Sequence, residues 1–245
     1  MAIVLSAGLL LIQAAARANE PSPEDLRIAK NLSTMLQSAR AVVSAHQTEI
    51  NDPAKGDKGL TGKVVLGEAI ANYKKATGTD PQTIDPKSYE GRLLKAQMAS
   101  VAEVMDANQA TINAPGVGFK GFIPATFARL VNEAFARRVG AEASVKVTAP
   151  SELIRNRQAR PDAWEVNAIK NYLQKADWPK GQIYAGIDKA NGKEITRVMV
   201  PEYYAPSCLS CHGGPKGELD ITHYPKEGAH ENDLGGIISV KLTPQ

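Results

Sequence analysis

Residues 182–212 read QIYAGIDKANGKEITRVMVPEYYAPSCLSCH, and this stretch contains both a hairpin signal and a cysteine motif. Two strand-like runs, 182–188 and 194–201, flank the dipeptide Asn191-Gly192, which is typical of a two-residue hairpin turn. The second run leads directly into a C-x-x-C-H motif at residues 208–212. The stretch therefore predicts an antiparallel hairpin that carries this motif late in the chain.

The motif contains the only two cysteines of the 245 residues, Cys208 and Cys211, and His212 follows the second one directly. C-x-x-C-H is the attachment signature of a c-type haem. The thiols add to the haem vinyl groups, and the imidazole becomes the proximal ligand of the iron. We therefore predict one covalent haem c on Cys208 and Cys211, with His212 bound to the iron.

Three other uses of a cysteine pair are less consistent with the sequence. A structural zinc site needs four ligands, and no second C-x-x-C or H-x-x-x-H motif is present. A thioredoxin-like dithiol belongs in a βαβ context, whereas Pro206 precedes this pair and 213–215 (GGP) ends any helix soon after it. A plain structural disulfide is the third alternative. The spacing together with the following histidine favours haem attachment.

Haem c is attached outside the cytoplasm in bacteria, so an export signal is expected near the N-terminus. Residues 2–12 form an apolar run, and residues 16–18 (ARA) have the small-x-small form of a cleavage site. No lysine or arginine precedes the run, which departs from the usual signal. We predict a signal peptide, or an uncleaved anchor, at 1–18 and one periplasmic or otherwise extracytoplasmic domain at 19–245.

The charge of the chain limits its partners. The formal net charge of +3 is too small to predict binding to nucleic acid or to a membrane surface. Contact with a membrane is expected only if the N-terminal segment stays uncleaved. The expected partner is a redox protein that the sequence does not identify.

Upstream of the hairpin, apolar residues recur at helical spacing and predict a helical N-terminal part. Polar loops are expected at 55–63 and 217–233. The expected helices are 23–50, 66–75, 89–107, a segment around 127–135 and 162–174, and further strands are expected at 143–148 and 236–242. Helices first and an antiparallel sheet late is an α+β pattern.

Several segments together resemble a known family, the bacterial extracytoplasmic haem-c proteins with a PAS-like fold. This family was long catalogued as a domain of unknown function, and it also occurs as the sensor module of chemoreceptors. The resemblance implies a central antiparallel sheet, long N-terminal helices and a single haem against the sheet. The segments that carry it are 115–122 (PGVGFKGF), 146–148 (KVT), 155–157 (RNR), 161–165 (PDAWE), 208–213 (CLSCHG) and 234–240 (LGGIISV).

Function depends on the second axial ligand of the iron, because a strong protein ligand suits electron transfer and an open position admits gases or peroxide. A thiolate is excluded, since no third cysteine exists. His46 is our candidate distal ligand, because it lies on the apolar face of a helix that the resemblance places beside the haem. The alternative is a core histidine bonded to backbone. Further candidates are His223, His230, Met35, Met98, Met105 and Met199.

Two arginines are candidate partners of the haem propionates. Arg155 and Arg157 carry guanidinium groups whose geometry matches a carboxylate. The alternative for both is a solvated basic face. Trp164 and Tyr204 are candidates for the lining of a haem pocket, with an ordinary core position as the alternative.

The sequence thus predicts a periplasmic monohaem c-type cytochrome that acts in one-electron transfer or redox response. With His212 and His46 on the iron, two imidazoles would stabilise Fe(III) and give a low potential. The alternative is a haem-based gas or redox sensor that signals through a partner. A peroxidase-like enzyme would need an open iron and a distal acid–base group, and no motif indicates one.

Overall fold

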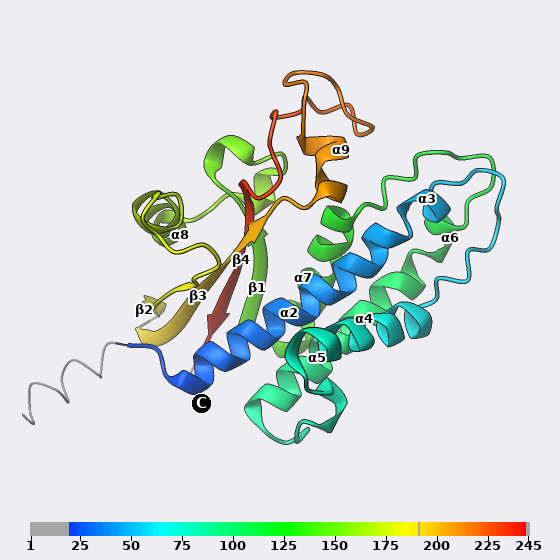
Figure 1. The fold of residues 1–245 in the computed structure, drawn as a ribbon. Coiled ribbons are helices and arrows are strands. Elements are labelled where there is room, and N and C mark those ends of the chain that lie inside the picture. The colour runs from blue at the N-terminus through cyan, green and yellow to red at the C-terminus, as the bar shows by residue number, and fades with distance from the viewer. Residues whose placement is uncertain (1–19, 191, 244–245) are drawn as a thin grey trace, which may run out of the picture.

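The computed structural model describes residues 20–190 and 192–243, which form an α+β fold (Figure 1). A four-stranded antiparallel sheet has the strand order β1-β4-β3-β2. The predicted signal peptide, residues 1–18, lies outside the described residues. Among the residues that are described, no helix is both long enough and apolar enough to span a bilayer.

The elements follow one another as the sequence pattern predicts, with helices first and most strands last. Those up to the first strand are α2 (Pro23–Ala45), α3 (Gln47–Ile50), α4 (Gly62–Thr77), α5 (Tyr89–Ala107), α6 (Gln109–Ile112), α7 (Pro124–Val139) and β1 (Ala143–Thr148). The later ones are α8 (Ala163–Ala168), a π-helical turn (Ile169–Leu173), β2 (Tyr184–Ala190), β3 (Lys193–Tyr203), α9 (Leu209–His212) and β4 (Leu234–Leu242).

Some predicted bounds are confirmed and others are changed by local chemistry. The helix 89–107 and the strand 143–148 are confirmed as α5 and β1. The helix predicted at 23–50 is divided at His46, whose backbone leaves the helical region. The helix predicted to start at Leu66 begins at Gly62, because the Thr61 side chain accepts the N–H of Val64 and caps it.

The prediction of an exposed loop at 55–63 is wrong in its middle. Lys58 and Leu60 are only 4% and 3% exposed. The Lys58 ammonium group donates to the carbonyl oxygens of Asp52 and Lys55, so its charge is satisfied by backbone. The local sequence does not distinguish a buried lysine that donates to backbone carbonyls from a lysine that is exposed to water.

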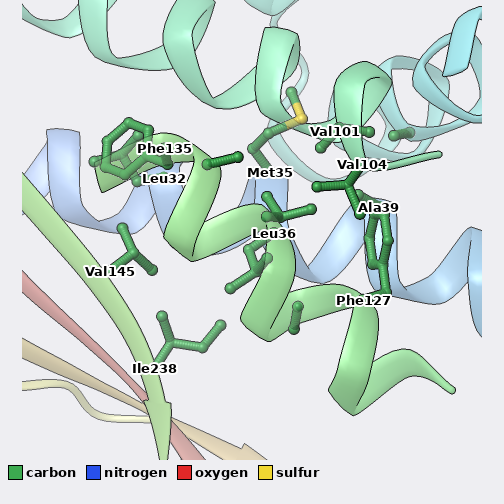
Figure 2. Packing of buried hydrophobic residues seen from close by; sticks show 14 of the residues in the cluster. Leu32, Met35, Leu36, Ala39, Val101, Val104, Phe127, Phe135, Val145 and Ile238 are labelled. Atoms are coloured by element: carbon green, nitrogen blue, oxygen red, sulfur yellow. The ribbon is translucent and has the colours of Figure 1, made fainter. Parts of the chain in front are cut away.

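The helices lie in layers on the sheet (Figure 1). α2 and α7 contact one face of the sheet, α4 and α5 pack outside them, and α8 lies on the opposite face. The main core lies between the sheet and the N-terminal helices (Figure 2), and its buried residues include Leu32, Met35, Leu36, Ala39, Val101, Val104, Phe127, Phe135, Val145 and Ile238. α2 is central because it contacts α4, α5, α7, β3 and β4.

The β2–β3 hairpin is confirmed by its register. Ala190 pairs with Lys193, which leaves Asn191-Gly192 as a two-residue connection. Gly192 has a φ of 76°, a region that glycine reaches without steric cost. Strand β3 then carries the chain to the C-x-x-C-H motif, as the sequence predicts.

The motif and the loop after it, residues 205–231, form one long connection between β3 and β4, which we call the C-x-x-C-H excursion. Tyr204 continues the pairing beyond β3, since its N–H donates to the carbonyl of Asp233 and its carbonyl accepts the N–H of Asn232. A bulge between Glu202 and Tyr203 interrupts the β3–β4 ladder at this point. The chain therefore leaves and re-enters the sheet at the same place, which fixes both ends of residues 205–231.

The central position of α2 predicts a large effect of truncating its core side chains. Replacing the fully buried Leu36 by Ala should lower the free energy of unfolding by about 2–5 kcal/mol, because a cavity remains between helix and sheet. Val64→Ala is the matched control, since Val64 is 43% exposed and its loss should change stability by no more than about 0.5 kcal/mol. Urea denaturation followed by circular dichroism measures both, and equal effects would contradict the layer assignment.

Candidate functional site

The C-x-x-C-H motif adopts one helical turn. Cys208 and Cys211 lie at either end of a turn that includes α9, and both thiols are free and partly exposed. Gly213 ends the turn, and its N–H donates to the carbonyl of Leu209. A Cβ at Gly213 would lie 2.6 Å from that same carbonyl oxygen, so this turn requires glycine directly after the histidine.

The alternatives for the cysteine pair gain no support from this setting. β3, which leads into the motif, and β4, which follows it, are antiparallel, unlike the βαβ context of a thioredoxin dithiol. Within residues 20–190 and 192–243, no group of three or more His, Cys, Asp or Glu side chains is arranged to hold a metal ion. The geometry instead leaves both thiols and one imidazole on a single turn.

The ring of His212 is held on one of its two nitrogens. Nδ1 lies 2.9 Å from Oε2 of Glu227 and 3.3 Å from the hydroxyl of Tyr204. Nε2 has no hydrogen-bond partner in the described part of the chain. Since an ionised carboxylate only accepts, Nδ1 carries the hydrogen and the lone pair of Nε2 is available to a metal. Histidines that bind metals are commonly held in this way.

The electrostatics of the site favour this protonation state. Burial, and then the positive charge of Arg155, lower the pKa of His212 below 6.5, so its imidazole is neutral at pH 7. Burial alone would raise the pKa of Glu227, but hydrogen bonds from Arg155 and His212 outweigh it and lower this pKa. Glu227 is therefore an ionised acceptor beside a neutral ring.

Arg155 connects the motif to the loop that follows it. Its Nε and Nη2 donate to the two carboxylate oxygens of Glu227, both at 2.8 Å, in a bidentate pair. Nη1 donates to Asp220 at 2.6 Å, and Nη2 also donates to the carbonyl of Cys211 at 2.9 Å. One side chain thus joins the buried carboxylate of Asp220 and the largely buried carboxylate of Glu227 to the backbone of the C-x-x-C-H turn.

The polar loop predicted at 217–233 is confirmed as a loop and is largely exposed, but internal contacts order it. Leu219 and Pro225 form an isolated antiparallel bridge. The Asp220 carboxylate is fully buried and accepts hydrogen bonds from the backbone of Thr222 and Tyr224. Backbone N–H groups of residues 228 and 229 donate to the carbonyls of residues 213 and 212, which ties the loop back to α9. Its path brings Glu227 against His212.

His46 lies between α2 and α3, and both of its ring nitrogens contact glutamates. Its side chain is 28% exposed. Nδ1 lies 3.0 Å from a carboxylate oxygen of Glu49, and Nε2 lies 3.3 Å from one of Glu68. It is therefore not a core histidine bonded to backbone. Its role as distal ligand stays a prediction, and it would require Nε2 to exchange Glu68 for iron.

The remaining ligand candidates divide into buried and exposed groups. Met35, Met105 and Met199 are fully buried in the two cores, and Met98 packs against the larger one. His223 occupies a tight turn with a φ of 60° and is exposed. The side chain of His230 is 87% exposed and pairs with Asp233.

The structure separates the other predicted site residues. Tyr204 joins the site, since its ring stacks on that of His212 with centroids 4.9 Å apart and 27° between planes. Trp164 does not, because its ring contacts Tyr184 and Arg197 on the sheet face below α8. Arg155 reaches the site but already has protein partners on Nε, Nη1 and Nη2, so a propionate would have to share or replace one. Arg157 is exposed, and within the described ranges no ion pair involves it.

Three residues of the site were not found by sequence reasoning. Glu227 and Asp220 lie in a stretch that resembles any charged loop, and only the expectation that a metal-bound histidine has a carboxylate partner points toward them. Gly235 belongs to the segment 234–240 that carries the family resemblance, but its role is steric. A Cβ there would lie 2.5 Å from the ring of Tyr204, so the tyrosine packs directly on the glycine backbone.

A family model described as Tll0287-like matches residues 26–243. No curated protein and no solved structure gives a significant match. The matched region includes the helices, the sheet and the whole C-x-x-C-H excursion.

The packing of Tyr204 on Gly235 predicts that a methyl group is not tolerated there. Gly235→Ala should destabilise the chain by about 1–3 kcal/mol, because the added methyl group would force the Tyr204 ring out of its present position. The neighbouring Gly236→Ala is the matched control, since its Cβ would meet nothing closer than 3.5 Å. Urea denaturation measures both variants, and a Gly235→Ala protein as stable as Gly236→Ala would contradict the predicted clash.

The contacts of His46 predict a pH-dependent contribution to stability. Burial alone would lower its pKa, but the hydrogen bonds and charges of Glu49 and Glu68 outweigh it and raise the pKa above 6.5. The stabilisation is therefore complete below pH 6.5 and is lost as the pH rises through the folded-state pKa.

Titration of the chain by NMR measures the pKa of His46 directly. The wild-type value should exceed 6.5, and Glu68→Gln should lower it. A wild-type value at or below 6.5 would show that the two glutamates do not hold His46.

Proposed function

The chain belongs to the Tll0287-like family, and from this membership and the geometry at His212 we propose that it is an extracytoplasmic monohaem c-type protein that exchanges single electrons. The observation that carries the proposal is one turn with two free thiols and a histidine whose Nδ1 is held, while its Nε2 has no hydrogen-bond partner among the described residues. The family is compatible with a haem-binding sensor or a cytochrome-like domain.

The residues present fit one covalent haem. Cys208 and Cys211 would form the two thioether bonds, and Nε2 of His212 would bind the iron. The bound group would supply one-electron exchange between Fe(III) and Fe(II). The protein's part is to hold the imidazole in one tautomer and orientation through Glu227 and Tyr204.

Two finer parts of the proposal concern the fold and the compartment. An antiparallel sheet whose first strand pairs with its last, with helices on both faces, supports a PAS-like architecture. The apolar run and the ARA sequence in residues 1–18 support export to the periplasm, where haem c is attached.

Carrier and sensor differ in the sixth position of the iron. If His46 exchanges Glu68 for iron, two imidazoles stabilise Fe(III) and suit a low-potential carrier.

The second candidate function, a gas or redox sensor that acts through a partner, is favoured by a specific observation. Both ring nitrogens of His46 are bonded to glutamates, and Met35, Met105 and Met199 are enclosed in the cores. In this conformation none of these side chains is free to bind iron, which favours an accessible sixth position.

Haem attachment is tested by expressing the chain for export together with a cytochrome c maturation system. The wild type should carry one covalent haem, measured as a mass increase of the denatured protein and by its haemochrome spectrum. The double variant Cys208→Ala, Cys211→Ala should carry none. Ser210→Ala is the matched control, because Ser210 lies between the two cysteines, and this variant should keep the haem. A wild type without covalent haem under these conditions would contradict the proposal.

Spectroscopy of the purified protein then separates the two functions. A low-spin ferrous haem that does not react with carbon monoxide supports the carrier, and a five-coordinate ferrous haem that binds it supports the sensor. His46→Ala should turn a low-spin haem high-spin if His46 is the distal ligand. An unchanged spectrum would place that ligand elsewhere.

A further inference from the structure

We infer that Glu227, oriented by Arg155, is a positioning residue that holds His212 in the Nδ1–H tautomer before haem arrives and lowers the reduction potential of the iron afterwards. The inference rests on the proposed haem attachment and deepens it. Its basis is the chain of contacts Arg155–Glu227–His212, in which each successive pair of side chains is joined by a hydrogen bond.

The tautomer follows from which groups can donate. The Glu227 side chain is only 15% exposed, and Arg155 donates to both of its oxygens, which keeps the carboxylate ionised and acceptor-only. At 2.9 Å from Oε2, Nδ1 must therefore be the donor. Nε2 is then the unprotonated nitrogen and is directed away from Glu227. A neutral partner in place of Glu227 would no longer require this tautomer.

The ring is restricted from its other side as well. Tyr204 stacks on it with ring centroids 4.9 Å apart, and the backbone of Gly235 lies against the Cδ1, Cε1 and Cζ atoms of the Tyr204 ring. A side chain at Gly235 would displace the tyrosine, so the backbone of β4 supports the stack. Orientation of His212 is therefore set by the folded chain itself, without any contribution from bound haem.

The charge of the cluster determines the effect on the iron. Arg155 is one cation between the buried carboxylate of Asp220 and the largely buried carboxylate of Glu227, so the three side chains together carry one negative charge. A net negative group hydrogen-bonded to the proximal histidine makes the imidazole a stronger donor. It also stabilises Fe(III) over Fe(II), because the oxidised iron is the more positive state. Both effects lower the potential.

A purely structural role for Glu227 makes a different prediction. In that case the carboxylate only fastens the loop to α9 through Arg155, and its charge is irrelevant to the iron. Loss of the charge would then change stability and leave the tautomer and the potential as they are. The two roles are therefore separated by measurements on His212 and on the iron, and not by stability.

The decisive variant is Glu227→Gln, which keeps the size of the side chain and removes its charge. In the haem-loaded protein the potential should rise, with the reduction equilibrium changing roughly tenfold, which is about 59 mV for one electron. Glu218→Gln is the matched control, because Glu218 lies in the same loop, is 52% exposed and pairs with Lys226 instead of His212. The control should leave the potential unchanged. Redox titration measures both.

A second measurement uses the haem-free full chain. The sequence has four histidines, so the imidazole nitrogen signals of His212 can be assigned by NMR. The wild type should show the Nδ1–H tautomer, and Glu227→Gln should show a mixture. Glu227→Asp, which keeps the charge, should retain most of the wild-type behaviour in both measurements. If Glu227→Gln does not fold, the wild-type tautomer still decides, because a haem-free wild type without the Nδ1–H tautomer overturns the inference.

The outcomes distinguish this inference from the proposed function. Covalent haem with the same potential in wild type and Glu227→Gln overturns the inference and leaves haem attachment intact. Equal shifts in Glu227→Gln and Glu218→Gln overturn it too, because they would reflect surface charge. A chain that never takes up haem overturns the proposed function and the effect on potential, while the tautomer of the haem-free chain still shows whether Glu227 positions His212.

Discussion

The 2.9 Å hydrogen bond between His212 and Glu227 is the contact on which the rest of the candidate site depends. It determines which imidazole nitrogen is free, and it requires an ionised carboxylate inside a partly buried loop. Arg155 meets that requirement by pairing with Glu227, because an unpaired buried carboxylate would cost several kcal/mol or become protonated. Arg155 in turn contacts Asp220 and the Cys211 carbonyl, so the loop and the turn form one hydrogen-bonded unit.

The sheet provides the rigid base of this unit. β3 and β4 enclose the excursion, and the pairing of Tyr204 with residues 232 and 233 closes it. The face of β3 and β4 that points toward the N-terminal helices is packed against α2, whose Arg40 also pairs with Glu202 at 2.6 Å near the end of β3. The position of the motif is therefore determined by the main core and not by the loop alone.

The opposite face of the sheet has a separate ionic network, and this network gives residues of the segment 161–165 a structural role. Arg197, only 3% exposed, donates to Asp162 at 2.7 Å and to Asp188 at 3.0 Å, and its guanidinium lies 4.4 Å from the Trp164 ring. Asp162 and Glu165 form a capping box at the start of α8. These residues hold α8 on the sheet, so their part in the family resemblance is structural.

Much of the fold and the centre of the candidate site follow from local sequence. Apolar spacing places α5 and β1, Asn191-Gly192 places the hairpin, and C-x-x-C-H identifies the two thiols and the imidazole of the candidate site, because each signal lies within a few residues. Only the tertiary structure brought Glu227 to His212, Glu68 to His46 and backbone carbonyls to Lys58. A charged side chain has the same local pattern whether water or a buried partner satisfies it, and which one does depends on the path of the loops.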